Sequence, residues 1–130
     1  MSTGARGEGI LIVGDEEHRE EHRILFTNRA LAEAEKRTGK TMVALAQGAT
    51  EGELGIGDMA ILLQTGLNAA RREAMGGARP LPPNTAFNLL DRAGFAQVAT
   101  VVLEAVGAVL AYDPNEEEEE GGAEEDSPPA

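Results

Sequence analysis

The composition of residues 113–130 limits how much of this chain can fold. That stretch contains no hydrophobic residue larger than alanine, so it can bury too little apolar surface to offset the entropy lost on ordering. The length of 130 residues suits a single domain. We therefore expect one folded domain over residues 1–112 and a disordered acidic tail over residues 113–130.

The negative charge of the chain is concentrated in the same tail. Nine of the 23 acidic residues lie in residues 113–130, which leaves 14 acidic against 11 basic residues in residues 1–112, a net charge of about −3. A protein that binds nucleic-acid phosphates directly needs a basic surface. We therefore expect no direct binding of nucleic acid.

Aromatic residues and cysteine are scarce. Three Phe, one Tyr and no Trp leave an aliphatic core that packs shallowly, and we expect a homo-oligomer because association would cover part of it. The absence of cysteine excludes disulfides, thiolate metal ligands and cysteine nucleophiles. Residues 1–8 lack the apolar run of a secretory signal, so we expect a cytoplasmic protein.

The hydrophobic pattern predicts a mainly α fold with an N-terminal β-hairpin. Short apolar runs at residues 10–13 and 23–27 indicate the two strands, and the charged segment 14–22 connects them. About five short helices follow. They are predicted at residues 28–38, 41–47, 58–72, 84–94 and 95–112.

Glycine and proline separate these helices. Gly39 is expected to end the first helix, and the segments 48–57 and 76–84 are too rich in glycine or proline for regular structure. Asn84 or Thr85 can cap the fourth helix. The clearest amphipathic pattern is that of the third helix, whose apolar stripe consists of Met59, Leu62, Leu63, Gly66, Leu67 and Ala70.

Residues 34–41, AEKRTGKT, satisfy a relaxed nucleotide-binding pattern in which alanine replaces the first glycine. That chemistry requires a buried strand before the loop and a helix after it, so that backbone amides surround the phosphates. Here the preceding residues predict an exposed helix. We therefore interpret Gly39 as a helix C-cap and expect no cofactor site.

The segment His18-Arg19-Glu20-Glu21-His22 fits the inverted zinc-protease pattern. In that pattern the two histidines and the glutamate share one face of a buried helix. Here they lie in the charged connector, and the chain has no further histidine. We interpret the segment as a solvated turn, and we expect neither a metal site nor catalytic residues, so the chain is predicted not to be an enzyme.

The predicted last helix, residues 95–112, has apolar residues on every side. Its length suits a membrane span, but the central Glu104 and its many alanines and glycines favour a buried helix, and no membrane association is expected. One small domain is unlikely to cover all sides of such a helix, so we expect part of it to contact a partner or a second copy. The residues predicted to make that contact, by their spacing, are Phe95, Val98, Val102 and Val109.

The five consecutive glutamates at residues 116–120 have three interpretations. They can form a solubilising extension, imitate a nucleic acid, or attract a basic partner. The first is the commonest role of such a composition. The sequence leaves all three open.

Three short motifs follow one another in a distinctive order. They are Leu31-Ala32-Glu33-Ala34-Glu35 before Gly39, then Gln64-Thr65-Gly66-Leu67, then Leu90-Asp91-Arg92-Ala93-Gly94-Phe95. In this order, behind a short strand pair, the motifs resemble those of the tail assembly chaperones of gene transfer agents and siphophages. The resemblance covers about residues 22–112. The charged connector and the acidic tail depart from the family pattern.

The resemblance implies a protein that binds the tape measure protein in the producing cell, keeps its long hydrophobic helices soluble and recruits tail tube subunits. Such a chaperone is absent from the mature particle. The alternative is a structural tail component, namely a tube or connector subunit. That alternative would require long β-strands, which the sequence does not predict.

Overall fold

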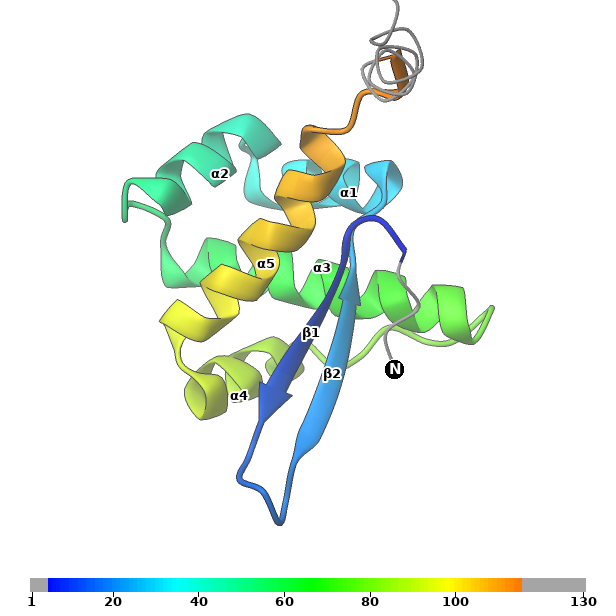
Figure 1. Cartoon of the computed structure of the whole chain (residues 1–130), viewed down its shortest axis with the longest axis vertical. Helices are drawn as coiled ribbons and strands as arrows, with labels where there is room; N and C mark the ends of the chain where they lie inside the picture. The colour runs from blue at the N-terminus through cyan, green and yellow to red at the C-terminus, as the bar shows by residue number, and fades with distance from the viewer. Residues whose placement is uncertain (1–4, 116–130) are drawn as a thin grey trace, which may run out of the picture.

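A computed structural model describes residues 5–115, which form a two-stranded hairpin and five helices (Figure 1). The elements in chain order are β1 (Glu8–Val13), β2 (Glu20–Leu25), α1 (Asn28–Thr38), α2 (Met42–Thr50), α3 (Ile56–Ala74), α4 (Asn84–Ala93) and α5 (Phe95–Leu110). The predicted mainly α fold with an N-terminal hairpin is confirmed. From residue 116 onward, the predicted tail lies outside the described residues.

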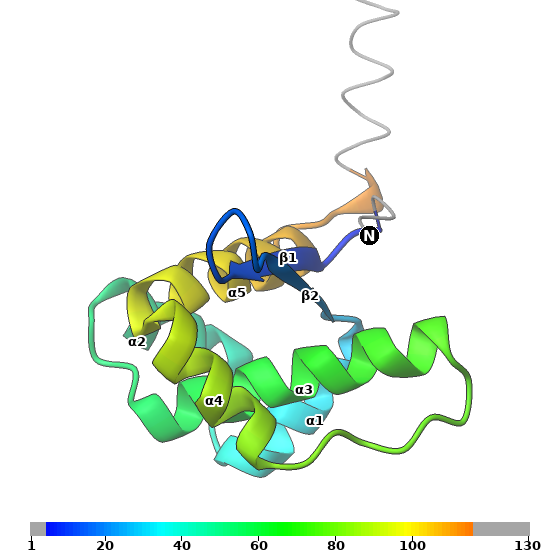
Figure 2. The ribbon, with the colours of Figure 1, turned by 90° about the horizontal axis from the view of Figure 1, so that it is seen from below.

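The elements form two layers around one core. Figure 2 shows the hairpin and α5 side by side in one layer, with α3 and α1 in the other. Strand β1 packs against α5, and β2 packs against α3. Helix α4 contacts both α3 and α5, while α2 lies against α5 and α1. The hairpin therefore bridges the two longest helices.

The hairpin is longer than its hydrophobic pattern predicts. Its register sets Glu8 opposite Leu25 and Val13 opposite Glu20, so the second strand begins inside the predicted connector, and the expected strand over residues 23–27 is displaced. The charged residues fit an extended strand because this end of the sheet is open to solvent. There Arg92 of α4 donates two hydrogen bonds to Glu20, at 2.8 and 3.0 Å, and with His22 it lowers the pKa of Glu20 to about 2.

The helix boundaries follow the predictions with three differences. Helix α1 has the predicted bounds, whereas α2 and α3 extend into the expected glycine-rich loop, which shrinks to residues 51–55. Helix α5 ends at Leu110. The predicted cap of α4 is wrong, because Pro83 occupies the cap position and Asn84 and Thr85 lie in the first turn.

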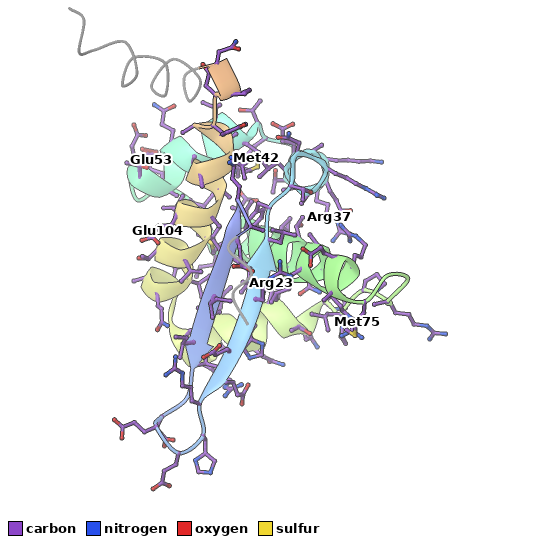
Figure 3. The ribbon with its side chains drawn as sticks, turned by 45° about the vertical axis from the view of Figure 1, so that its right-hand side comes forward. Arg23, Arg37, Met42, Glu53, Met75 and Glu104 are labelled. Carbon is purple, nitrogen blue, oxygen red and sulfur yellow. The ribbon has the colours of Figure 1, made fainter. Side chains whose placement is uncertain are left out.

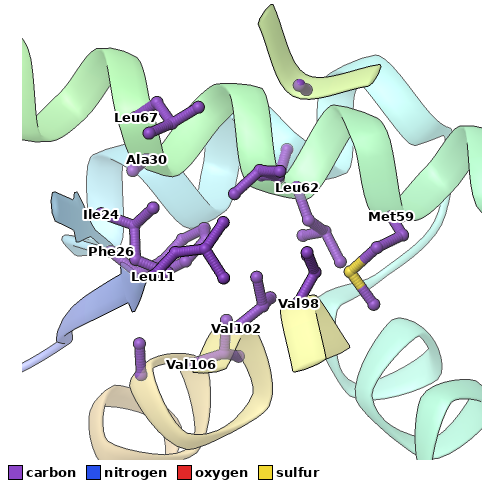
Figure 4. Packing of buried hydrophobic residues seen from close by; sticks show 14 of the residues in the cluster. Leu11, Ile24, Phe26, Ala30, Met59, Leu62, Leu67, Val98, Val102 and Val106 are labelled. Carbon is purple, nitrogen blue, oxygen red and sulfur yellow. The ribbon is translucent and has the colours of Figure 1, made fainter. Parts of the chain in front are cut away.

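One hydrophobic core joins both layers (Figure 4). Most of its largest completely buried side chains come from the hairpin and the residue after it, α3 and α5, and α2 adds Leu45; they include Leu11, Ile24, Phe26, Leu62, Leu63, Val98 and Val102. Phe26 follows directly after β2 and is the only buried aromatic residue in this core. The rest of the core is aliphatic, as the composition predicts.

The contact between β2 and α3 depends on Gly66. A Cβ atom at this position would lie 2.8 Å from Cζ of Phe26 and 3.1 Å from Cβ of Ile24. Such distances are too short for carbon atoms, so a larger residue would push the Phe26 ring out of its place. Gly66 thereby allows the helix and the end of the strand to pack closely.

An almost buried arginine fixes the hairpin to α3. Arg23 of β2 donates a hydrogen bond to Glu8 on the neighbouring strand and forms a two-pronged ion pair with Glu73 of α3, at 3.1 and 3.2 Å. The side chain of Arg23 is only 9% exposed. Its planar guanidinium can bond both carboxylates at once, which a lysine could not do in this geometry.

Within residues 5–115, no single helix is both long and apolar enough to cross a membrane. Taken together, α4 and α5 meet that test by length and composition, but they are bent by 114° at the break between them. The break falls at Gly94.

The packing of α3 predicts a strong effect of one buried charge. Leu63 is fully buried, so Leu63→Asp should lower the free energy of unfolding by about 3–5 kcal/mol, because the carboxylate would have no partner. Val43→Asp is the matched control, since Val43 is 67% exposed. Denaturant titration of both variants measures the difference. Equal stabilities would show that the core lies elsewhere.

Candidate functional site

Helix α3 is buried around its whole circumference in its central part. The apolar stripe faces the core as predicted, but all residues from Leu62 to Ala70 are buried, including Gln64, Thr65 and Asn68. Thr65 satisfies its hydroxyl within the helix by donating to the carbonyl of Ile61 at 2.7 Å. The other two polar side chains need partners outside α3, and these come from the connection to α4.

Gln64 uses both ends of its amide to hold this connection. Its Nε2 donates to the backbone carbonyls of Leu81 and Pro82, at 2.9 and 3.1 Å, and its Oε1 accepts from the backbone N–H of Ala86 at 3.1 Å. Ala86 lies in the first turn of α4, where backbone N–H groups lack partners within the helix. Gln64 therefore replaces the cap that Pro83 cannot supply, since proline has no capping side chain.

Two more side chains of α3 continue this contact along the same side of the helix. Asn68 accepts a hydrogen bond from the backbone N–H of Leu81 at 2.8 Å, and Arg71 donates to the carbonyl of Arg79 at 3.0 Å. Residues 80, 82 and 83 are prolines and have no N–H to satisfy. The proline-rich segment, residues 79–83, is thereby fixed against α3 as an ordered wall.

This wall, α3 and the end of α1 enclose two adjoining depressions of about 400 Å³ each. They share Arg37, Gln64 and Pro83, and we call them together the α3 groove. The part nearer α4 is lined by Arg37, Gly57, Asp58, Ala60, Ile61, Gln64, Pro83 and Phe87. The part nearer the end of α3 adds Asn68, Pro80, Leu81 and Pro82.

The α3 groove is chemically apolar, although polar residues line it. The amide of Gln64 is fully used by the backbone, and Asp58 is paired with Nζ of Lys40 at 2.6 Å. Phe87 is 47% exposed, so part of its apolar surface is open to solvent. The remaining charge is that of Arg37, for which residues 5–115 supply no ion pair. Such a groove suits an apolar side chain that has a carboxylate nearby.

The predicted contact residues of α5 lie in different environments. Val98 and Val102 are fully buried in the core, Val109 is half-buried, and Phe95 is 37% exposed. Val98 and Val102 therefore cannot contact a partner in this structure, and the prediction needs correction at these two positions. Helix α5 packs against β1, α2, α3 and α4, which the helix pattern alone does not reveal.

The nucleotide-binding pattern at residues 34–41 joins two helices. Gly39 has φ 73° and its N–H donates to the carbonyl of Glu35 at 2.8 Å, so it is the predicted C-cap of α1. Thr41 then caps α2 by accepting from the N–H of Ala44 at 3.0 Å. The segment follows a helix instead of the strand that a phosphate-binding loop requires.

The two histidines do not share a helical face. His18 lies in the hairpin turn, as expected, whereas His22 lies in β2 opposite Leu11. The interpretation of the whole segment as a turn is thus correct for His18 and wrong for His22. Among the residues that the structure describes, no group of three His, Cys, Asp or Glu side chains is placed to hold a metal ion.

Sequence reasoning did not identify the α3 groove. Ile61, Pro83 and Phe87 gave no motif, but one signal was present: two amides four residues apart on the polar side of α3, followed by a segment rich in proline. Comparison with models of protein families, with curated proteins and with solved structures finds no match for this chain. The function must therefore be argued from the chain itself.

The contact between Gln64 and the wall is testable by a change of similar volume. Gln64→Leu should lower the free energy of unfolding by about 1–3 kcal/mol, because it leaves the N–H of Ala86 and the carbonyl of Leu81 without partners, while the carbonyl of Pro82 keeps its bond from the N–H of Thr85. Gln47→Leu on the exposed side of α2 is the control and should change stability little. Thermal unfolding of both variants, followed by circular dichroism, makes the comparison. Equal midpoints would mean that water replaces Gln64 at no cost.

The burial of α5 can be tested with a matched pair of charges. Val102→Glu should lower the free energy of unfolding by about 3 kcal/mol or more, since its carboxylate would be buried without a partner. Phe95→Glu should leave the fold intact, because Phe95 is partly exposed and a negative charge suits the first turn of a helix. Urea titrations distinguish the two. A folded Val102→Glu variant would restore this position as a possible contact residue.

Proposed function

We propose that this protein is a non-enzymatic tail assembly chaperone of the gene transfer agent or siphophage type. It binds the tape measure protein in the cytoplasm of the producing cell, keeps the apolar helices of that protein soluble and helps tail tube subunits to assemble. It is absent from the mature particle. The proposal rests on the resemblance of the short motifs, and the α3 groove supplies a surface suited to the task.

The three motifs that carry the resemblance lie on helices that share one core, in which α1 and α4 each pack against α3. Leu31 of α1, Leu67 of α3 and Leu90 of α4 are buried in the same core. Gln64, in the second motif, also holds the wall of the α3 groove. The motifs therefore have a joint structural role, which supports the proposal more strongly than their common residue types do.

The single observation that carries the choice of binding surface is the character of the α3 groove. Both ends of the Gln64 amide are hydrogen-bonded to the backbone, the proline-rich wall is held against α3, and Phe87 is exposed at the edge of the groove. A groove of this kind accepts apolar side chains from one face of an amphipathic helix. Arg37 adds a preference for an acidic residue beside them. A long helical protein such as a tape measure protein offers such faces repeatedly.

Co-expression with a fragment of the tape measure protein from the same genome tests the function. The chain should keep the fragment in the soluble fraction and copurify with it. Particles purified from the producing strain should lack the chain, whereas its presence there would favour the structural tail component. A fragment that stays insoluble or free in spite of the chain would contradict the chaperone proposal.

Substitutions of two exposed phenylalanines can show which surface binds the tape measure fragment. Phe87→Glu places a charge at the α3 groove, and Phe95→Glu places one at the start of α5, where the sequence predicted a contact. We expect Phe87→Glu to weaken capture of the fragment by about tenfold or more, and Phe95→Glu to leave it nearly unchanged. Pull-down at graded fragment concentrations measures both. The reverse order would place the contact on α5.

A further inference from the structure

Three cations lie on α1, and residues 5–115 provide them with no ion pair; the same is true of Arg71, Arg72 and Arg79, in and after the last turn of α3. Arg29, Lys36 and Arg37 are all exposed, and they lie at positions i, i+7 and i+8 of one helix. Only Glu33 lies among them, so this cationic face has a net charge of +2. Elsewhere Arg19, Arg23, Lys40 and Arg92 each form an ion pair with a carboxylate.

The chain leaves the described structure close to this face. Tyr112 lies under the guanidinium of Arg6, 3.3 Å from the ring centroid. Gly7, which follows Arg6, accepts a hydrogen bond from the N–H of Phe26 at 2.8 Å. Phe26 directly precedes Thr27, the residue that caps α1. The end of α5 is thus held near the beginning of α1, although the two helices lie in different layers (Figure 2).

The sequence beyond this point carries the opposite charge. Residues 116–126 hold eight carboxylates, of which five are consecutive, and residues 116–130 include no basic residue. Fully extended, residues 116–126 could span up to about 40 Å, whereas α1 is only about 16 Å long. Covalent linkage gives such a segment an effective concentration on the order of millimolar at a nearby surface.

We propose that the acidic segment, residues 116–126, binds in cis to the cationic face of α1 and shields that face from other polyanions. The partner is a carboxylate-rich segment of the same chain, recognised by charge complementarity and by proximity. This proposal goes beyond the proposed function and does not depend on it, because the α3 groove is a separate surface that shares only Arg37.

A spin label can locate the segment in the full chain. Because the sequence has no cysteine, Ala123→Cys provides a single thiol for a nitroxide. We expect the nitroxide to broaden the amide signals of α1 at least about twofold more than the amide signals of α2. This broadening should vanish as the salt concentration rises from about 0.1 to about 1 M, because the Debye length falls from about 10 to about 3 Å. Figure 3 shows Arg37 on the opposite side from Glu53 and Glu104.

A matched pair of double variants tests the assignment to this face. Arg29→Gln with Lys36→Gln should remove the broadening of α1, whereas Arg19→Gln with Arg92→Gln removes the same charge from paired cations and should preserve it. Neither variant touches the α3 groove. Equal effects of the two variants, broadening of α1 and α2 alike, or broadening that moves to Arg72 and Arg79 would overturn the proposal. Broadening seen only when a nitroxide-labelled copy is mixed with a separate isotope-labelled copy would also overturn the proposal, because the contact would then lie between two chains.

Immobilised heparin, a polyanion, tests the shielding. Replacing the five consecutive glutamates of residues 116–120 with glutamine should raise the salt concentration needed to elute the protein from heparin. The changes are Glu116→Gln, Glu117→Gln, Glu118→Gln, Glu119→Gln and Glu120→Gln. Adding Arg29→Gln and Lys36→Gln should cancel that increase, and adding Arg19→Gln and Arg92→Gln should largely retain it. If both additions lower retention equally, the increase reflects net charge alone and the shield is refuted.

Discussion

The whole structure depends on how the central part of α3 is covered. Helix α3 packs against β2, α1, α4 and α5, and the close approach at Gly66 brings the Phe26 ring against the helix backbone. Its polar side is also buried, which is possible only because the connection to α4 supplies hydrogen-bond partners for Gln64 and Asn68. A polar side chain buried without such partners would destabilise the fold. The same bonds hold the proline-rich wall in place.

That arrangement explains why the α3 groove lies beside the proline-rich wall. The hydrogen bonds that bury α3 also consume the polar groups of the α3 groove, so the groove is left with apolar atoms and the charge of Arg37. Binding by packing is the chemistry that remains. The cationic face of α1 is electrostatically distinct, because it carries three cations and only one carboxylate. A partner helix and an acidic segment can therefore be recognised by different forces.

The sequence predicted the burial of α5 better than that of α3. Helix α3 has a polar side and was expected to bury one stripe, yet its central part is enclosed on all sides. Helix α5 is apolar all round and was expected to be only partly covered by one domain, and Phe95, Ala96 and Ala108 do remain exposed. Periodicity reports which side chains favour burial. It does not report which backbone groups from distant residues will satisfy the polar ones.

The sequence by itself determined the mainly α class, the number of helices, the bounds of α1 and its end at Gly39. These features are local, because helix periodicity, caps and glycine act over a few residues. Tertiary structure alone decided that Glu20 extends the hairpin, that Gln64 caps α4 from another helix, and that Val102 is internal while Phe87 is exposed. Each of these depends on contacts between residues far apart in the chain, and no local pattern encodes such a contact.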